Sequence, residues 1–113
     1  MRVTSALWVA AFIRRCQGEG AVATLARRGA EEAGAIAIVI DHLDGRQDLY
    51  LPAPQTAFGE AAVTDRLFQK VVEGGDGPAI RERIDRERRF DPDLWVVDVE
   101  DRDARILFDL AKE

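Results

Sequence analysis

Six carboxylates surround a short apolar run in the segment DPDLWVVDVEDRD, residues 91–103. If this run is a β-strand, alternate side chains point to opposite faces, so Asp98 and Glu100 share a face. Two carboxylates at that spacing could hold one hard cation such as Mg²⁺, as in metal-dependent hydrolases and nucleases. A nuclease would also place a lysine nearby, and no lysine occurs between Lys70 and Lys112. We therefore interpret the segment as a strand with a solvated acidic end, and keep the metal site as an alternative.

Arginines form the second candidate site. Residues 1–30 contain five arginines and one acidic residue, whereas the whole chain has a formal net charge of -5. Such a basic region could bind an acidic partner, an anion or nucleic acid, although the negative net charge disfavours nucleic acid. The candidate binding residues are Arg14, Arg15, Arg27 and Arg28. The simpler interpretation is that these arginines pair with the acidic C-terminal half.

The single histidine and the single cysteine restrict catalysis. One imidazole excludes any site that needs two, although His42 could act with Asp41, Asp44 or Asp48. The arginines beside Cys16 could activate it as a nucleophile, but a packed helical position is the simpler interpretation. A lone cysteine forms no internal disulfide and no cysteine-based zinc cage, so we expect a reducing cytoplasm.

Cofactor and membrane signals are weak. The stretch EGGDGPAI lacks the lysine and the serine or threonine of a P-loop, so we expect no cofactor. No apolar run approaches the roughly 18 residues of a membrane span, and we expect no membrane contact. The N-terminus imitates a signal peptide only loosely, because Arg14 and Arg15 directly follow its apolar run.

Apolar periodicity and turn signals predict two helices. Thr4 or Ser5 can cap the first, from Ala6, and Gly18 or Gly20 can stop it. Because LWVAAFI is apolar on every face, a buried strand is the alternative for this segment. The second helix begins at Pro78 and ends at the dipeptide Asp91-Pro92, since a residue before proline leaves the helical region.

The remaining apolar segments predict strands. They cover residues 21–29, 35–43, 46–51, 65–73 and 94–101. The segment 35–43 begins with six apolar residues, which is typical of a strand in the middle of a sheet. Residues 55–66 suggest a loop with at most a helical turn, and residues 104–113 suggest a short strand or a terminal helix.

Asp44-Gly45 predicts a tight hairpin turn. A two-residue loop would place Asp41 opposite Asp48, where like charges destabilise a sheet. We expect a loop one residue longer, which would place His42 opposite Asp48 instead.

Together these elements predict an α+β fold. We expect an antiparallel or mixed sheet of four to five strands with two packed helices, in a single domain spanning residues 1–113. The length of 113 residues, with 47% hydrophobic and 33% charged residues, suits one soluble core.

Several stretches also resemble a known family. The segments LWVAAFIRR, RRGAEEAGAI, LYLPAPQ and RERRFDPDLWVVDVED are similar to the domain of unknown function 1491 family of small alphaproteobacterial proteins. The resemblance covers nearly the whole chain. It implies a single-domain, cytoplasmic, alphaproteobacterial protein, and it implies no activity.

The absence of a catalytic signature favours a noncatalytic binding or adaptor module, whose partner is an unknown protein or a second copy. The apolar run ALWVAAFI needs cover on more than one side, which predicts a homodimer with Trp8 as a central anchor. The alternatives are a metal-dependent hydrolase or nuclease and an anion or nucleic-acid binder that uses the arginines. Trp95, between a proline corner and two valines, should be a core anchor.

Overall fold

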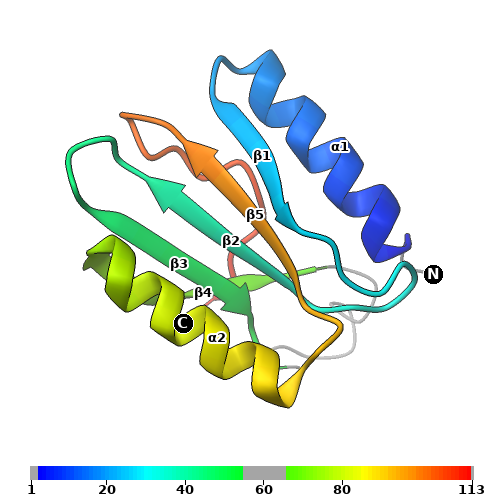
Figure 1. The fold of residues 1–113 in the computed structure, drawn as a ribbon. Helices are drawn as coiled ribbons and strands as arrows, with labels where there is room; N and C mark the ends of the chain where they lie inside the picture. Colours follow the sequence, from blue (N-terminus) through cyan, green and yellow to red (C-terminus); the bar gives the residue numbers. More distant parts are fainter. Residues whose placement is uncertain (1–2, 55–65, 113) are drawn as a thin grey trace.

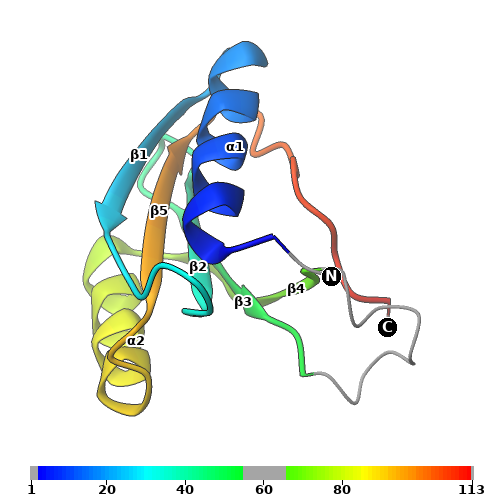
Figure 2. The same cartoon turned by 90° about the vertical axis from the view of Figure 1, so that its right-hand side faces the viewer.

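A five-stranded sheet separates two helices that cover its opposite faces (Figures 1 and 2). The computed structural model describes residues 3–54 and 66–112. In chain order the elements are α1 (Ser5–Gly18), β1 (Val22–Arg27), β2 (Ile36–Asp41), β3 (Gln47–Pro52), β4 (Phe68–Gly75), α2 (Gly77–Phe90) and β5 (Trp95–Glu100). This arrangement confirms the predicted α+β fold.

The strand order is β1-β5-β2-β3-β4. After α2, the chain returns to the sheet and inserts β5 between β1 and β2, antiparallel to β1 and parallel to β2. The other pairs are antiparallel, so the sheet is mixed. Strand β2 lies between β5 and β3 with its first five residues buried, as its apolar sequence predicted.

The first segment is a helix and not a strand. The Thr4 hydroxyl accepts a hydrogen bond from the Leu7 backbone N–H at 3.2 Å and caps it. Val9, Phe12 and Cys16 are buried at helical spacing and pack against β1 and β5. Much of the apolar run is therefore covered within the chain, although the opposite side leaves Leu7 58% exposed.

The larger core lies between the sheet and α1. It includes the fully buried Trp95 and an aromatic cluster in which Phe108 contacts Phe12, Tyr50 and Phe68 edge-on. The smaller core lies under α2, where Ile80 packs on inward-facing residues of β2, β3 and β5. In β5, Trp95, Val97 and Val99 share one face, as the strand alternation predicted, and this face is the one that α1 covers.

One local prediction was wrong, and the start of one helix differs from its predicted position by one residue. Residues 104–112 form neither a helix nor a regular strand, and Leu110 makes a single parallel bridge to Phe68 while Phe108 enters the core. Helix α2 begins at Gly77, because Asp76 accepts the capping hydrogen bond from the Ala79 N–H. Most of the predicted loop 55–66 lies outside the described residues.

The β2–β3 hairpin has the predicted longer loop, but its predicted register is wrong. The loop residues are Leu43, Asp44 and Gly45, and the His42 N–H donates to the Arg46 carbonyl at 3.0 Å. Consequently Asp48 pairs with Ile40 and not with His42. Leu43 and Gly45 both adopt positive φ. This conformation lets the loop begin at Leu43, one residue earlier than the predicted pairing requires.

None of the helices in the described part of the chain combines the length and the apolar character needed to cross a bilayer.

Candidate binding groove

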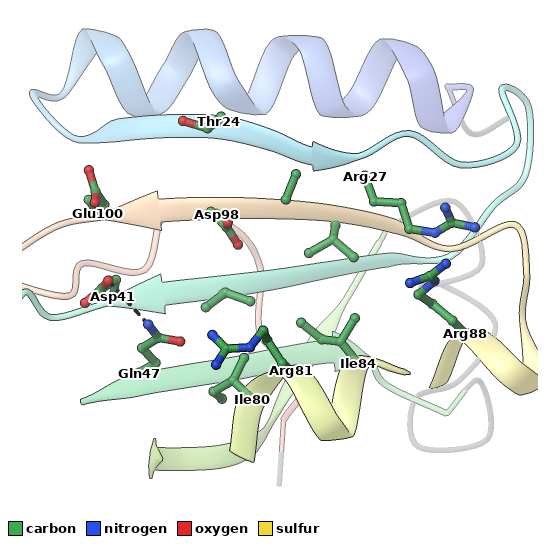
Figure 3. Close-up of a pocket in the computed structure, with 13 residues that line it drawn as sticks. Thr24, Arg27, Asp41, Gln47, Ile80, Arg81, Ile84, Arg88, Asp98 and Glu100 are labelled. Carbon is green, nitrogen blue, oxygen red and sulfur yellow. Dashed lines mark hydrogen bonds between the residues drawn. The ribbon is translucent and has the colours of Figure 1, made fainter. Parts of the chain in front are cut away.

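A groove of about 520 Å³ lies on the α2 face of the sheet (Figure 3). Helix α2 packs over β3 and β4, so it leaves the β1–β5 side of this face open. Thirteen residues from β1, β2, β3, β5 and α2 line the groove. They are Thr24, Ala26, Arg27, Val39, Asp41, Gln47, Ile80, Arg81, Ile84, Arg88, Val96, Asp98 and Glu100.

The alternation of β5 positions the centre of the groove. Val96 is buried in the floor, while Asp98 and Glu100 follow it on the same face at intervals of two residues. In the register, Asp98 lies between Thr24 of β1 and Val39 of β2. The floor is therefore apolar at one end of β5 and acidic at the other.

Three carboxylates gather at the acidic end. Asp41 of β2 pairs directly with Glu100 of β5, and Asp98 lies one repeat away on the same face (Figure 3). One Asp41 oxygen accepts the Leu43 N–H at 2.8 Å, whereas the Asp98 carboxylate accepts no hydrogen bond from any described residue. Asp98 is open to the groove yet flanked by protein, so desolvation raises its pKa, and the charges of Asp41 and Glu100 raise it further.

This geometry gives little support to the alternative hypothesis of a metal site at Asp98 and Glu100. Asp98 and Glu100 do share a face as predicted, and parallel pairing adds Asp41, which sequence reasoning missed. Nevertheless, no group of three or more histidine, cysteine or acidic residues within residues 3–54 and 66–112 is placed to hold a metal ion. We therefore assign no metal centre.

Arginines dominate the other end of the groove. Arg27 of β1 and Arg88 of α2 come from opposite walls, and Figure 3 shows their guanidinium groups directed into the same region. One Arg27 terminal nitrogen donates to the Pro92 carbonyl at 2.9 Å, while its Nε is buried and has no hydrogen-bond partner among the described residues. Arg88 makes one ion pair, to Asp85 at 3.6 Å.

The groove charges are not paired with one another. It is lined by three cations, Arg27, Arg81 and Arg88, and by the three carboxylates described above. No ion pair in the described structure joins any of these cations to any of these carboxylates. Arg27 and Arg88 lie at the end away from the carboxylates, whereas Figure 3 shows Arg81 at the same end as Asp41 and Gln47.

The four predicted arginines do not form one patch. Helix α1 and strand β1 run antiparallel, so Arg14 and Arg15 lie near their connection and Arg27 and Arg28 lie at the far end of β1 (Figure 1). Arg28 instead covers the Trp95 ring at 5.1 Å. Among these four residues, only Arg27 lines the groove.

Trp8 packs within the chain. Its ring stacks on Phe12 with centroids 5.1 Å apart and contacts Phe68 at 5.4 Å, which leaves it half-buried. The homodimer anchored by Trp8 stays a prediction, which a mass measurement by light scattering would test.

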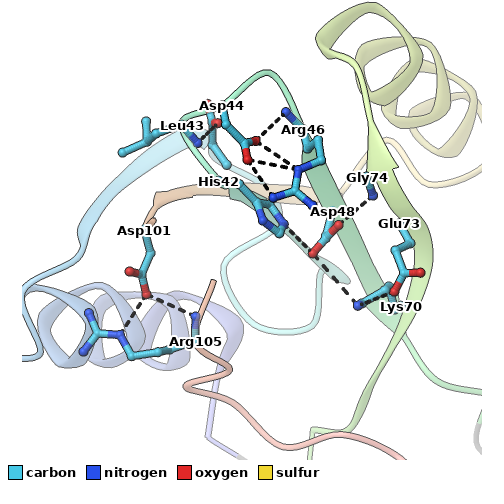
Figure 4. Close-up of polar contacts among 11 residues, drawn as sticks. His42, Leu43, Asp44, Arg46, Asp48, Lys70, Glu73, Gly74, Asp101 and Arg105 are labelled. Atoms are coloured by element: carbon cyan, nitrogen blue, oxygen red, sulfur yellow. Dashed lines mark hydrogen bonds and ion pairs between the residues drawn. The ribbon is translucent and has the colours of Figure 1, made fainter. Parts of the chain in front are cut away.

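A second polar cluster lies on the opposite face of the sheet (Figure 4). Asp48 accepts hydrogen bonds from the Gly74 N–H at 2.7 Å and from His42 Nε2 at 2.8 Å, and Lys70 pairs with Glu73 at 2.9 Å. Burial opposes ionisation of Asp48, but these hydrogen bonds together lower its pKa below the usual value. The adjacent hollow of about 650 Å³ is lined by this cluster, in which His42, Asp48, Lys70 and Glu73 already have partners, and by Lys112.

The comparisons with known proteins concern the family. Residues 3–109 match the family described as Protein of unknown function (DUF1491). The chain belongs to this family. Comparison with curated proteins gives no match.

Solved structures of the family share the fold. The solution structure of protein Atu0922 from A. tumefaciens is 39% identical, with a TM-score of 0.85 over 100% of this chain and 98% of that one. A crystal structure of a DUF1491 family protein from Caulobacter crescentus CB15 is 34% identical, with a TM-score of 0.78 over 97% and 99%. An NMR structure from the same organism is 33% identical, with a TM-score of 0.78 over 99% of each chain. The relatives are alphaproteobacterial, as the sequence resemblance implied.

Proposed function

We propose that this DUF1491 chain is a noncatalytic binding module whose ligand site is the groove between α2 and β1. The observation that carries the proposal is that opposite charges line one groove without pairing with one another. Ligand sites in proteins are typically concave and largely apolar, with a few polar groups that fix orientation. Asp98 makes no hydrogen bond to a described residue and is available to a ligand, unlike Asp48, whose carboxylate accepts from Gly74 and His42.

The composition of the groove favours binding over catalysis. Its lining contains no histidine, cysteine or lysine, and Thr24 supplies its only hydroxyl group. His42 and Cys16 both lie outside the groove, and Cys16 is on the buried face of α1. A cytoplasmic location is part of the same proposal, because a free buried thiol suits a reducing compartment.

The test is a ligand screen observed on the protein by NMR. The isotope-labelled chain would be titrated with short peptides, nucleotides and divalent cations, one class at a time. Binding should move the backbone resonances of groove residues, those of Asp98 and Arg88 among them, and leave those of α1, on the other face of the sheet, unchanged.

A matched pair of variants locates the site. Thr24 is exposed and faces the groove, so Thr24→Trp should fill it and abolish binding. Leu25 is the next residue on the same strand and faces the other side, so Leu25→Trp should leave binding unchanged. Equal binding by wild type and Thr24→Trp would refute the proposal, as would resonance shifts confined to another surface.

A further inference from the structure

We infer that the occupant of the groove is a short extended segment of a partner protein that has a basic residue at one end and an acidic residue at the other. This inference rests on the proposed function and specifies its ligand. It starts from the way the groove charges are distributed along β5. Glu100 and Asp98 mark one end of the strand, and Arg27, which pairs with Val96, marks the other.

The spacing of the charges fits a peptide of about five residues. Val96 and Glu100 are four residues apart on one strand, which corresponds to about 13 Å at the rise of a β-strand. Five extended residues span the same distance between their first and last Cα atoms. Their first, third and fifth side chains point to one side. A basic first side chain can therefore reach Asp41 and Glu100, and an acidic fifth side chain can reach the arginines, while an apolar third side chain lies over the Asp98 position, beside Val39.

The arginine end suits a carboxylate. A planar guanidinium matches a carboxylate in a two-bond geometry, and Arg27 and Arg88 approach the same region from opposite walls. The Pro92 carbonyl holds one terminal nitrogen of Arg27, while the other, Nη1, makes no hydrogen bond to a described residue and can donate to an incoming anionic oxygen. This donor is an observation independent of the charge pattern.

Charge complementarity also separates the peptide from other ligands. A nucleic acid or nucleotide would gain from Arg27 and Arg88 but would be repelled by Asp41, Asp98 and Glu100. A polyamine would gain from the carboxylates and be repelled by the arginines. A segment that carries both charges is attracted at both ends.

The experiment compares four blocked pentapeptides by NMR titration. The expected ligand is acetyl-Lys-Ser-Val-Ser-Asp-amide, in which charges occupy only the two end side chains. The controls are Lys-Ser-Val-Ser-Lys and Asp-Ser-Val-Ser-Asp with the same blocked ends, and Ser-Lys-Val-Asp-Ser, which brings the two charges closer together. The first peptide should bind most tightly, with shifts confined to the groove.

Charge reversal on α2 then tests the contact. Arg88→Glu should weaken binding of the mixed-charge peptide about tenfold, because one charged hydrogen-bond donor is lost. The same variant should improve binding of the two-lysine peptide, which a merely structural role of Arg88 would not do. Arg86→Glu is the control, because Arg86 is exposed on the same helix and lines no part of the groove.

The outcomes distinguish the two proposals. Binding of the mixed-charge peptide no tighter than that of the doubly charged peptides overturns the inference, as does binding of only the two-aspartate peptide or of inorganic phosphate at Arg27 and Arg88. If a different compound binds in the groove and is excluded by Thr24→Trp, the inference fails and the proposed function stands. If Thr24→Trp changes the binding of no ligand, both fail.

Discussion

Replacing Trp95 by alanine should remove much of the stability of the fold. The side chain is 1% exposed, and its indole N–H donates to the Ala30 carbonyl at 2.8 Å. The ring also packs against the loop before β2, where a Cβ added to Gly34 would lie only 2.9 Å from its Cδ1 atom. Truncation of a buried tryptophan costs about 3 to 5 kcal/mol, and the lost hydrogen bond adds about 1 kcal/mol. We expect Trp95→Ala to lower the free energy of unfolding by about 4 to 6 kcal/mol.

The assay is equilibrium urea denaturation followed by far-ultraviolet circular dichroism. Because the sequence has two tryptophans, Trp8 fluorescence gives an independent probe in the variant. Trp95→Phe is the control: it keeps a large ring and loses the N–H, so its cost should be clearly smaller. A loss below about 1 kcal/mol for Trp95→Ala would refute the packing argument, since buried large-to-small changes cost more than that.

Three further predictions concern titratable groups. Asp98→Asn should raise the free energy of unfolding at pH 7 by about 0.5 kcal/mol. Because folding raises the pKa of Asp98, this gain should vanish below the unfolded pKa of 3.8. Denaturation at pH 7 and at pH 3 would show the difference. Asp48→Asn should lower the free energy of unfolding by about 2 to 3 kcal/mol at pH 7. Because folding lowers the pKa of Asp48, the stability that its carboxylate contributes is complete above pH 3.8 and is lost as the pH falls through the folded pKa. An unchanged midpoint of urea denaturation would contradict this prediction. Burial raises the pKa of Cys16 to about 11, so iodoacetamide at pH 8 should modify it only in unfolded protein, and rapid alkylation of native protein would show an accessible thiol.

Local signals in the sequence were sufficient for most of the elements. Thr4 caps α1 and Pro78 lies in the first turn of α2, because capping and proline effects depend only on neighbouring residues. The apolar run of β2 predicted its central place, since a strand without a polar face must be covered on both sides. The alternation of β5 likewise predicted which of its side chains share a face, although not which helix covers that face.

Strand pairing limited what could be predicted of the site. Nothing local indicates that β5 inserts between β1 and β2, and only this insertion places Asp41 beside Glu100 and Arg27 beside Val96. The cationic wall depends on how α2 lies over the sheet, which brings Arg88 toward a strand that is far away in sequence. The hairpin loop begins one residue earlier than predicted. Asp48 is therefore opposite Ile40 and not His42.

Two aspartates on strands show why the groove, and not the hairpin, is the better candidate for function. Asp48 is 4% exposed, but its carboxylate accepts hydrogen bonds from the Gly74 N–H and from His42. Its charge therefore has a structural role, because it links β3 to β4. Asp98 has no such partner among the described residues, and two neighbouring carboxylates oppose its ionisation. Folding alone would favour an uncharged side chain at this position, because like charges on adjacent strands destabilise a sheet. Asp98 thus carries a charge that the fold does not use, on the floor of a groove whose other end holds Arg27 and Arg88. A site for a ligand that carries both charges requires this arrangement.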